Sequence, residues 1–267
     1  MFGQFSAMHN NVKLEFSGEL RKIPPSRMFD ETEKDELANF FLVLATVFND
    51  LKGYMIFQEL IVDNYRFPDS GETSVHSAEF MGLHIHLTRL IVGTLHEYFM
   101  FLNSKKDVIS STEFKSILNT INSKTVEDTW EDIMAVATGS TERDSEFIKN
   151  ILYIRNKVSF HYDNGKELKR AFCNLFFHRE KMEFNNFAYY AVSGDLNKTR
   201  FFFADAVTEE YLRMHSDNND KFETMSGYSK ETLELIGKIN FVTSRLLKSY
   251  LRNLPKDRDE KQLIIIK

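Results

Sequence analysis

The fold is decided by one long apolar segment, residues 33–64, which reads EKDELANFFLVLATVFNDLKGYMIFQELIVDN. Its large apolar side chains recur at intervals of three and four residues, which places them on one face of an α-helix. They are Leu37, Phe40, Phe41, Leu44, Val47, Phe48, Leu51, Met55 and Leu60. The residues Asp30–Glu33 have the pattern of a capping box, so we expect a helix of roughly 45 Å that ends near Asn64.

The rest of the chain continues the helical pattern. A second long helix is expected over residues 74–103, with shorter ones over 111–122 (Ser110 as its N-cap), 126–137, 142–160, 166–182, 205–215 and 230–252. Only 11 glycines and 4 prolines occur in 267 residues, whereas β-sandwiches and barrels need frequent turn-forming residues. Residues 183–204 predict a small hairpin or an extended loop. The sequence therefore predicts an all-α fold, an up-and-down helical bundle with additional helices and a small irregular or β segment.

Four regions are expected along the chain. They are an N-terminal arm over residues 1–30, a helical bundle over 31–182, a C-terminal helical extension over 183–252 and a tail over 253–267. Pro255 ends the last expected helix, because proline cannot continue one. The tail includes the apolar run Leu263–Ile266, which could add a strand to a partner's sheet or pack on the chain's own surface.

Charge, cysteine content and hydropathy exclude several classes of protein. The formal net charge of −5 and the isoelectric point near 5.9 argue against a broad basic surface that coats nucleic acid, but not against a local basic pocket. Cys173 is the single cysteine, so an internal disulfide and a cysteine-based zinc cluster are excluded. The apolar stretches 40–48 and 87–102 are too short or are interrupted by charges. We therefore expect no signal peptide, no membrane association and a cytoplasmic location.

The candidate catalytic residues are Arg155 and His161, near the end of the helix expected over 142–160. RNA cleavage through its own 2′-hydroxyl needs a group that moves protons near neutral pH and a cation that stabilises the phosphate. Histidine suits the first role because its unperturbed pKa is about 6.5, and arginine suits the second because it stays charged and binds phosphate bidentately. Asn156 and Lys157 lie between them and are candidate substrate-binding residues.

The segment Arg155-Asn156-Lys157-Val158-Ser159-Phe160-His161 resembles the motif of the HEPN superfamily. Those proteins are helical bundles whose last long helix carries Arg, often followed by Asn or another polar residue, and then His after four to six positions. The resemblance covers residues 33–182, and the paired long helices before the motif are most similar to the abortive-infection type.

The resemblance implies a metal-independent endoribonuclease of a toxin–antitoxin or phage-defence (abortive infection) system that needs no cofactor. It further implies an RNA substrate, a homodimer in which both subunits contribute Arg and His to a shared cleft, and an antitoxin or defence partner. One difference concerns regulation. Tyr162 follows His161 directly, whereas one residue intervenes in toxins that are paired with nucleotidyltransferase antitoxins, which argues against control by adenylylation of Tyr162.

Two alternatives to a ribonuclease stay open. The chain could be a non-catalytic HEPN module that binds a nucleotide or a protein partner. It could also be a helical scaffold without an active site, in which Arg155 packs between helices and His161 interacts with a helix C-terminus. Six positions along an ideal helix set the side chains of Arg155 and His161 about 120° apart. The helix must therefore loosen before His161, or the pair must meet across a dimer axis.

The helix expected over residues 74–103 supplies two further candidates, Arg89 and His96. Together with His86 and Gly93 they follow one another at steps of three, four and three, so they share one helical face. The functional interpretation makes Arg89 and His96 substrate-binding residues on a second wall of the same cleft. The alternative is a polar face with histidines packed between helices. No carboxylate stands at a usual ligand spacing from these histidines, so no metal site is expected.

Overall fold

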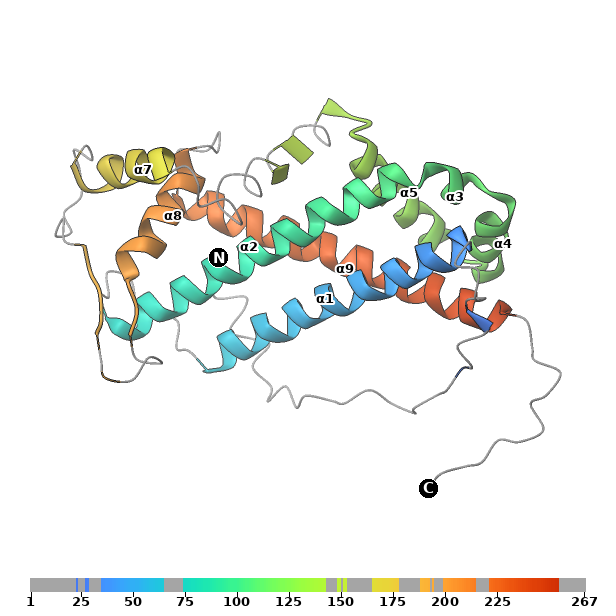
Figure 1. Ribbon diagram of the computed structural model, residues 1–267, viewed down its shortest axis with the longest axis horizontal. Coiled ribbons are helices and arrows are strands. Elements are labelled where there is room, and N and C mark those ends of the chain that lie inside the picture. The colour runs from blue at the N-terminus through green and yellow to red at the C-terminus, as the bar shows by residue number, and fades with distance from the viewer. Residues whose placement is uncertain are drawn as a thin grey trace, which may run out of the picture.

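The computed structural model describes residues 23, 27–28, 35–64, 74–142, 148–149, 151–152, 165–177, 188–192, 194, 199–214 and 221–254. Three long helices form its body: α1 (Glu36–Asn64), α2 (Val75–Ser104) and α9 (Lys221–Asn253). The short helices α3 (Lys106–Ser110), α4 (Thr112–Ile121) and α5 (Lys124–Thr138) lie at one end, and α7 (Gly165–Phe177) and α8 (Phe202–Met214) lie at the other (Figure 1). The described residues contain no β-strand and one isolated antiparallel bridge, Ala191 with Arg200, which confirms the all-α class.

Contacts between side chains fix the directions of the long helices. Helix α2 runs antiparallel to α1, because Lys105 Nζ lies 2.6 Å from Glu36 Oε2 at one end of the pair, while the hydroxyls of Tyr54 and Thr94 are 3.0 Å apart near its middle. Helix α9 is also antiparallel to α1, since Tyr250 stacks on Phe41 near the start of α1, while Asn240, earlier in α9, lies with its Nδ2 atom 3.6 Å from Sδ of Met55, later in α1. It follows that α2 and α9 run in the same direction.

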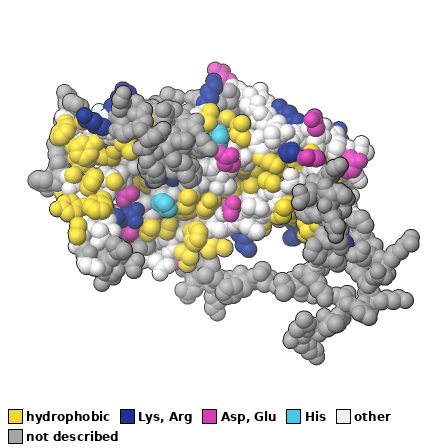
Figure 2. Space-filling model, in the orientation of Figure 1, with side chains coloured by type: hydrophobic (Ala, Val, Ile, Leu, Met, Phe, Trp, Pro, Cys, Tyr) yellow, Lys and Arg dark blue, Asp and Glu magenta, His cyan; other side chains and the backbone are white. Residues whose placement is uncertain are grey.

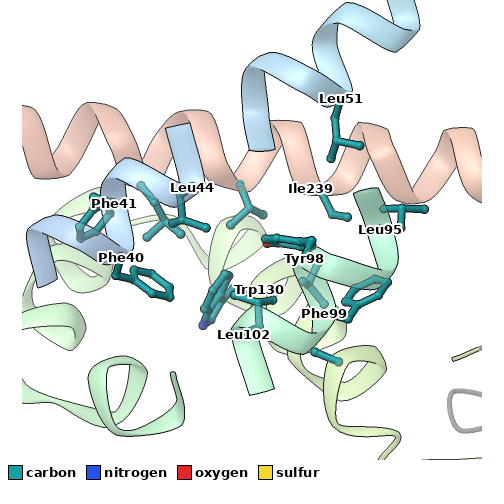
Figure 3. Packing of buried hydrophobic residues seen from close by; sticks show 14 of the residues in the cluster. Phe40, Phe41, Leu44, Leu51, Leu95, Tyr98, Phe99, Leu102, Trp130 and Ile239 are labelled. Carbon is teal, nitrogen blue, oxygen red and sulfur yellow. The ribbon is translucent and has the colours of Figure 1, made fainter. Parts of the chain in front are cut away.

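The main core lies where α1, α2, α4, α5 and α9 meet (Figure 3). The rings of Phe41 and Tyr250 stack with centroids 4.1 Å apart, and Phe40 stacks on Phe101 at 5.3 Å. Trp130 of α5 packs against Phe114 of α4. Each such side chain stabilises the fold by roughly 1.5–3 kcal/mol on burial. The stripe predicted for the first helix therefore builds the core through Phe40, Phe41, Leu44 and Leu51. The prediction is wrong at Leu60, whose side chain is exposed.

The N-terminal caps of three helices can be compared with the caps predicted from the sequence. Ser74 caps α2 through a capping box with Ser77. The Asp35 carboxylate accepts a hydrogen bond from the Ala38 N–H at the start of α1, whereas the capping box expected at residues 30–33 lies outside the described residues. The prediction of Ser110 as the N-cap of α4 is wrong by one residue. Ser111 takes that place and accepts from the Phe114 N–H at 3.2 Å.

Two helices differ from the expectation for identifiable reasons. Helix α9 begins nine residues earlier than the expected residue 230, because a polar segment with Gly227 hides the apolar repeat there. Helix α3 was not expected, since five residues are too few to show a period. Of the helix expected over 142–160, residues 142, 148–149 and 151–152 are helical and the others lie outside the described residues.

A second, smaller apolar cluster joins α7 to α8. Its buried members are Ala171, Leu175, Val207 and Tyr211. Helix α9 belongs instead to the main core, through Ile236, Ile239, Val242, Leu246 and Tyr250. The last helix of the chain therefore packs in the same core as α1, and α7 and α8 share the second cluster.

Helix α1 has a further property. By length and composition it is the one helix of the described part that could cross a membrane, with a mean hydropathy of 1.4 over an 18-residue window of which 22% is buried. From the sequence we expected no membrane span, whereas the length and hydropathy of α1 are sufficient for one. In the fold, α1 uses its buried face to contact α2 and α9.

Candidate functional site

The four motif residues of the candidate site, Arg155, Asn156, Lys157 and His161, lie outside the described residues. The described residues that lead toward them are helical, and Figure 1 shows them as short yellow-green pieces between α5 and α7. Ile151 is 4% exposed and belongs to the main core, and Ile148 packs against the same cluster. The segment that precedes the motif is therefore docked on the bundle.

Arg89 and His96 are both on α2 but lie at different depths. Arg89 is half-buried, whereas His96 is 8% exposed. The Nδ1 atom of His96 lies 3.3 Å from a carboxylate oxygen of Glu97, whose side chain is exposed. His86, at the other end of the expected stripe, is exposed. The stripe thus passes from the surface at His86 into the bundle at His96.

His84 of α2, one turn along from Phe80, has a distinct environment. Its Nε2 atom lies 3.3 Å from the Gln58 side-chain nitrogen of α1, and its ring stacks on the Phe80 ring with centroids 5.0 Å apart. Burial lowers the pKa of His84, because the charged imidazolium loses hydration there. A neutral ring whose Nε2 atom accepts from the Gln58 amide fits this position between α1 and Phe80.

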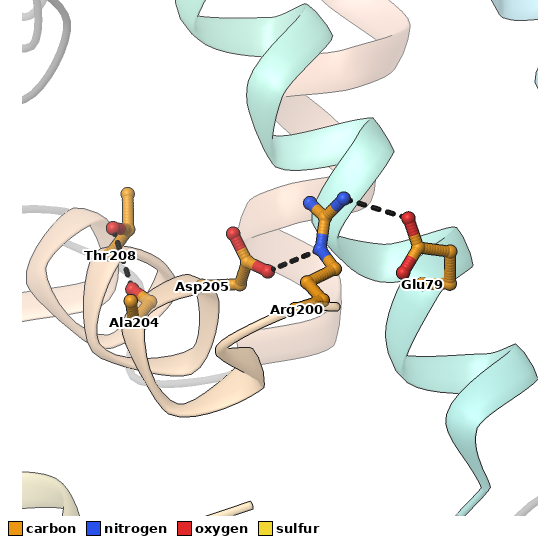
Figure 4. A network of polar contacts seen from close by, with 5 residues as sticks. All are labelled: Glu79, Arg200, Ala204, Asp205 and Thr208. Carbon is orange, nitrogen blue, oxygen red and sulfur yellow. Dashed lines mark hydrogen bonds and ion pairs between the residues drawn. The ribbon is translucent and has the colours of Figure 1, made fainter. Parts of the chain in front are cut away.

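The most highly organised charged group joins three separate segments, and sequence reasoning missed it. Arg200 donates from Nη1 to Glu79 Oε1 of α2 at 2.8 Å and from Nε to Asp205 Oδ2 of α8 at 2.9 Å (Figure 4). Burial by itself would lower the pKa of Arg200, but the hydrogen bonds and negative charges of Asp205 and Glu79 outweigh it and raise that pKa. We call these three residues the Arg200 clamp. It fastens α8 and the bridge at Ala191 to the first turns of α2.

Gly82 explains how the clamp reaches α2. A Cβ atom at this position would lie 2.2 Å from Arg200 Nη2 and 2.5 Å from Asp205 Oδ2. The guanidinium therefore occupies the space that a side chain would take. A glycine inside a long helix was the one sequence signal of this close approach, although it does not tell which residue approaches.

A second buried charge sits between α7 and α8. The side chain of Glu210 is 0% exposed, accepts from Asn174 Nδ2 of α7 at 2.5 Å and pairs with Arg213 one turn further along α8. The hydrogen bond to Glu210 raises the pKa of Arg213. Both carboxylate oxygens of Glu210 accept hydrogen bonds, Oε1 from Asn174 and Arg213 and Oε2 from Arg213, so this group holds the two helices together.

The surface near the Arg200 clamp and Glu210 carries more apolar side chains than charged ones (Figure 2). Figure 2 shows apolar side chains gathered at the end where α7 and α8 lie, with lysines and arginines in small separate groups. Among the described residues, no three His, Cys, Asp or Glu side chains come together in a way that could hold a metal ion. No protein-family model, no curated protein and no solved structure matches the chain.

Proposed function

We propose that the protein is a HEPN-type, metal-independent endoribonuclease that acts in a toxin or phage-defence system of the abortive-infection kind. The observation that supports this best is the burial of Ile151 in the main core, four positions before Arg155 in the sequence. The same core contains the antiparallel pair α1 and α2. A motif carried by a helix that packs on two long paired helices is the arrangement that the resemblance implies.

The proposed reaction uses the RNA's own 2′-hydroxyl as the nucleophile. That oxygen attacks the adjacent phosphorus, the bond from phosphorus to the 5′-oxygen breaks, and a 2′,3′-cyclic phosphate forms. The proton of the 2′-hydroxyl passes, through His161, to the leaving 5′-oxygen. Arg155 binds the phosphate and stabilises the negative charge that builds up on it, as a bidentate cation does best.

The other candidate residues have supporting roles in this proposal. Asn156 orients Arg155 or the phosphate, and Lys157 adds positive potential for the RNA backbone. Arg89 is half-buried and can contact RNA, whereas the buried His96 acts by shaping the wall behind it. Two copies of the chain bring their motifs to one cleft, which also removes the geometric difficulty of placing Arg155 and His161 together on one helix.

The test is cleavage of total tRNA and mRNA by the purified full chain in the presence of EDTA. The wild-type protein is compared with Arg155→Ala and His161→Ala, and with Arg252→Ala as a matched control, because Arg252 is exposed in the last turn of α9. Far-ultraviolet circular dichroism establishes that every variant is folded. We expect the control to cleave as the wild type does, and the two motif variants to lose at least 100-fold in rate, the usual scale for a general acid–base group.

Each other outcome contradicts the proposal in a particular way. Cleavage that all four proteins share would come from a contaminant. Cleavage that EDTA abolishes would require a metal site. Absence of cleavage, with binding of a nucleotide or a protein that Arg155→Ala weakens, would favour the non-catalytic module, and variants that change stability alone would favour the scaffold.

A further inference from the structure

The outer face of α9 is basic, although the chain as a whole has a net charge of −5. After Glu234 the helix contains no further acidic residue before it ends at Asn253. Four basic residues follow Glu234, all of them exposed: Lys238, Arg245, Lys248 and Arg252. They recur at steps of seven, three and four, so they share one face of the helix. This face lies away from the side that Ile239 and Leu246 bury in the main core.

Two of the four cations are balanced by the protein itself. Lys238 Nζ lies 3.1 Å from Asp132 Oδ2 of α5. Arg252 is in the last turn of α9, where the negative end of the helix dipole stabilises a cation. Arg245 and Lys248 differ from these two, because neither forms an ion pair with a carboxylate of the described residues. The positive charge that remains on this face is therefore concentrated at Arg245 and Lys248.

An exposed aromatic ring lies next to these two cations. Phe241 is 38% exposed, and Arg245, four residues further along the helix, holds its Cζ atom 5.7 Å from the centre of the ring. A guanidinium in this position is attracted by the negative face of the ring. Two flat groups are thus held together at the surface of a helix, beside the charge of Lys248. We call Phe241, Arg245 and Lys248 the α9 platform.

The chemistry of the α9 platform fits single-stranded nucleic acid. Sites for such ligands combine cations that contact phosphates with flat side chains on which bases stack. Both an aromatic ring and a guanidinium plane can serve as the stacking surface. An acidic peptide would use the two cations and leave the ring of Phe241 without a partner. Recognition of an anionic membrane takes clusters of about four to eight basic residues, more than the α9 platform offers.

We propose that the α9 platform binds single-stranded RNA, with Arg245 and Lys248 on its phosphates and a base stacked on Phe241. The inference rests on the proposed function, since it takes RNA as the ligand of this chain. It adds a contact that uses none of the motif residues. Because the α9 platform holds the RNA and takes no part in the reaction, its loss should raise KM and leave kcat unchanged.

Binding of an oligonucleotide that cannot be cleaved tests the proposal. The probe is a fluorescein-labelled oligodeoxythymidylate of about 12 nucleotides, a usual site size, which offers phosphates and bases but no 2′-hydroxyl. Its affinity for the full chain is measured by fluorescence anisotropy at several salt concentrations. Arg245→Gln with Lys248→Gln removes both charges, and Phe241→Leu removes the ring but keeps an apolar side chain. The matched control is Lys52→Gln with Lys106→Gln, two exposed lysines of α1 and α3.

The two kinds of variant should differ in their dependence on salt. We expect the loss of both charges to reduce the slope of log affinity against log salt by about 1.4, because each phosphate contact with a single strand contributes about 0.7. Phe241→Leu should weaken binding about tenfold at every salt concentration without changing the slope, since stacking releases no counterions. The control should keep the wild-type affinity within about twofold, and circular dichroism establishes that all variants are folded.

Several outcomes would overturn the proposal. These are absence of binding by the wild type, and equal changes in the platform variants and the control. Another is binding of phosphatidylserine vesicles or polyglutamate that the charge variant loses while its affinity for the oligonucleotide is unchanged. Failure of the enzyme is distinguishable. A chain that binds the probe through the α9 platform without cleaving RNA would overturn only the ribonuclease, and cleavage with an unchanged KM in the platform variants would overturn only the α9 platform.

Discussion

At the scale of single residues, the packing of α8 against α2 depends on the lack of a side chain at Gly82. Arg200 lies where a side chain at position 82 would be, and from there its guanidinium reaches carboxylates on two different helices. These side chains are about three-quarters buried, so solvent screens their interaction less than it screens a surface pair. Gly82 is therefore part of the Arg200 clamp although it has no functional group.

Gly82→Ala should destabilise the protein by about 1–3 kcal/mol, because the new methyl group would displace the guanidinium and leave its partners without it. The matched control is Gly53→Ala in α1, where a Cβ atom meets nothing within 4 Å. Alanine is a better helix former than glycine, so the control should gain roughly 0.5–1 kcal/mol. The free energy of unfolding in urea measures both, and an equal gain at the two positions would contradict the clamp.

His84 should make the fold sensitive to acid. Its pKa is lowered by burial, so below about pH 6.5 the unfolded chain binds a proton that the folded chain does not bind. The stability contributed by the neutral ring is complete above that pH and is lost as the pH falls toward the lowered pKa. We predict that His84→Gln loses less stability than the wild type between pH 7 and pH 5 in chemical denaturation. Parallel curves for the two proteins would show that the ring is hydrated in the folded state.

At the scale of elements, α7 and α8 form a unit that the rest of the bundle does not enclose. They share their own apolar cluster and the buried Glu210, which accepts a hydrogen bond from Asn174 of α7 and forms an ion pair with Arg213 of α8. Removing one partner of a buried charged group is costly because the others are left without compensation. The stability of this helix pair should therefore respond to Glu210 separately from the stability of the main core.

Glu210→Ala should reduce the protection of α7 and α8 against hydrogen exchange by about 2–3 kcal/mol, while α1 and α2 keep theirs. Glu131→Ala, at an exposed position of α5, is the matched control and should change neither region by more than about 0.5 kcal/mol. Exchange followed by mass spectrometry resolves the two regions. Equal loss of protection in α2 and α7 would show that the two clusters unfold as one.

At the scale of the whole molecule, the periodicity of apolar residues predicts helices and their buried faces. It does not predict which side chains from distant parts of the chain form contacts. The stripe from Leu37 to Leu51 predicts α1 and its buried face, and the structure confirms both. No period connects Arg200 to Glu79, 121 positions apart, or Asn174 to Glu210, because each pairing depends on how helices pack. The all-α class followed from composition, whereas the joining of α9 to α1 did not. Of the candidate site, the sequence supplied the residue types, and the structure shows Ile151 anchored before them.

The central claim is that Arg155 and His161 cleave RNA through its own 2′-hydroxyl, and the chemistry of the product ends tests it most directly. Short RNA is incubated with the full chain in EDTA, and the new ends are identified by mass spectrometry, beside RNA with a single 2′-deoxy nucleotide at the cleaved position. The account predicts 2′,3′-cyclic phosphate and 5′-hydroxyl ends, and no cleavage at the deoxy position. Ends with a 3′-hydroxyl and a 5′-phosphate, or cleavage at the deoxy nucleotide, would contradict it.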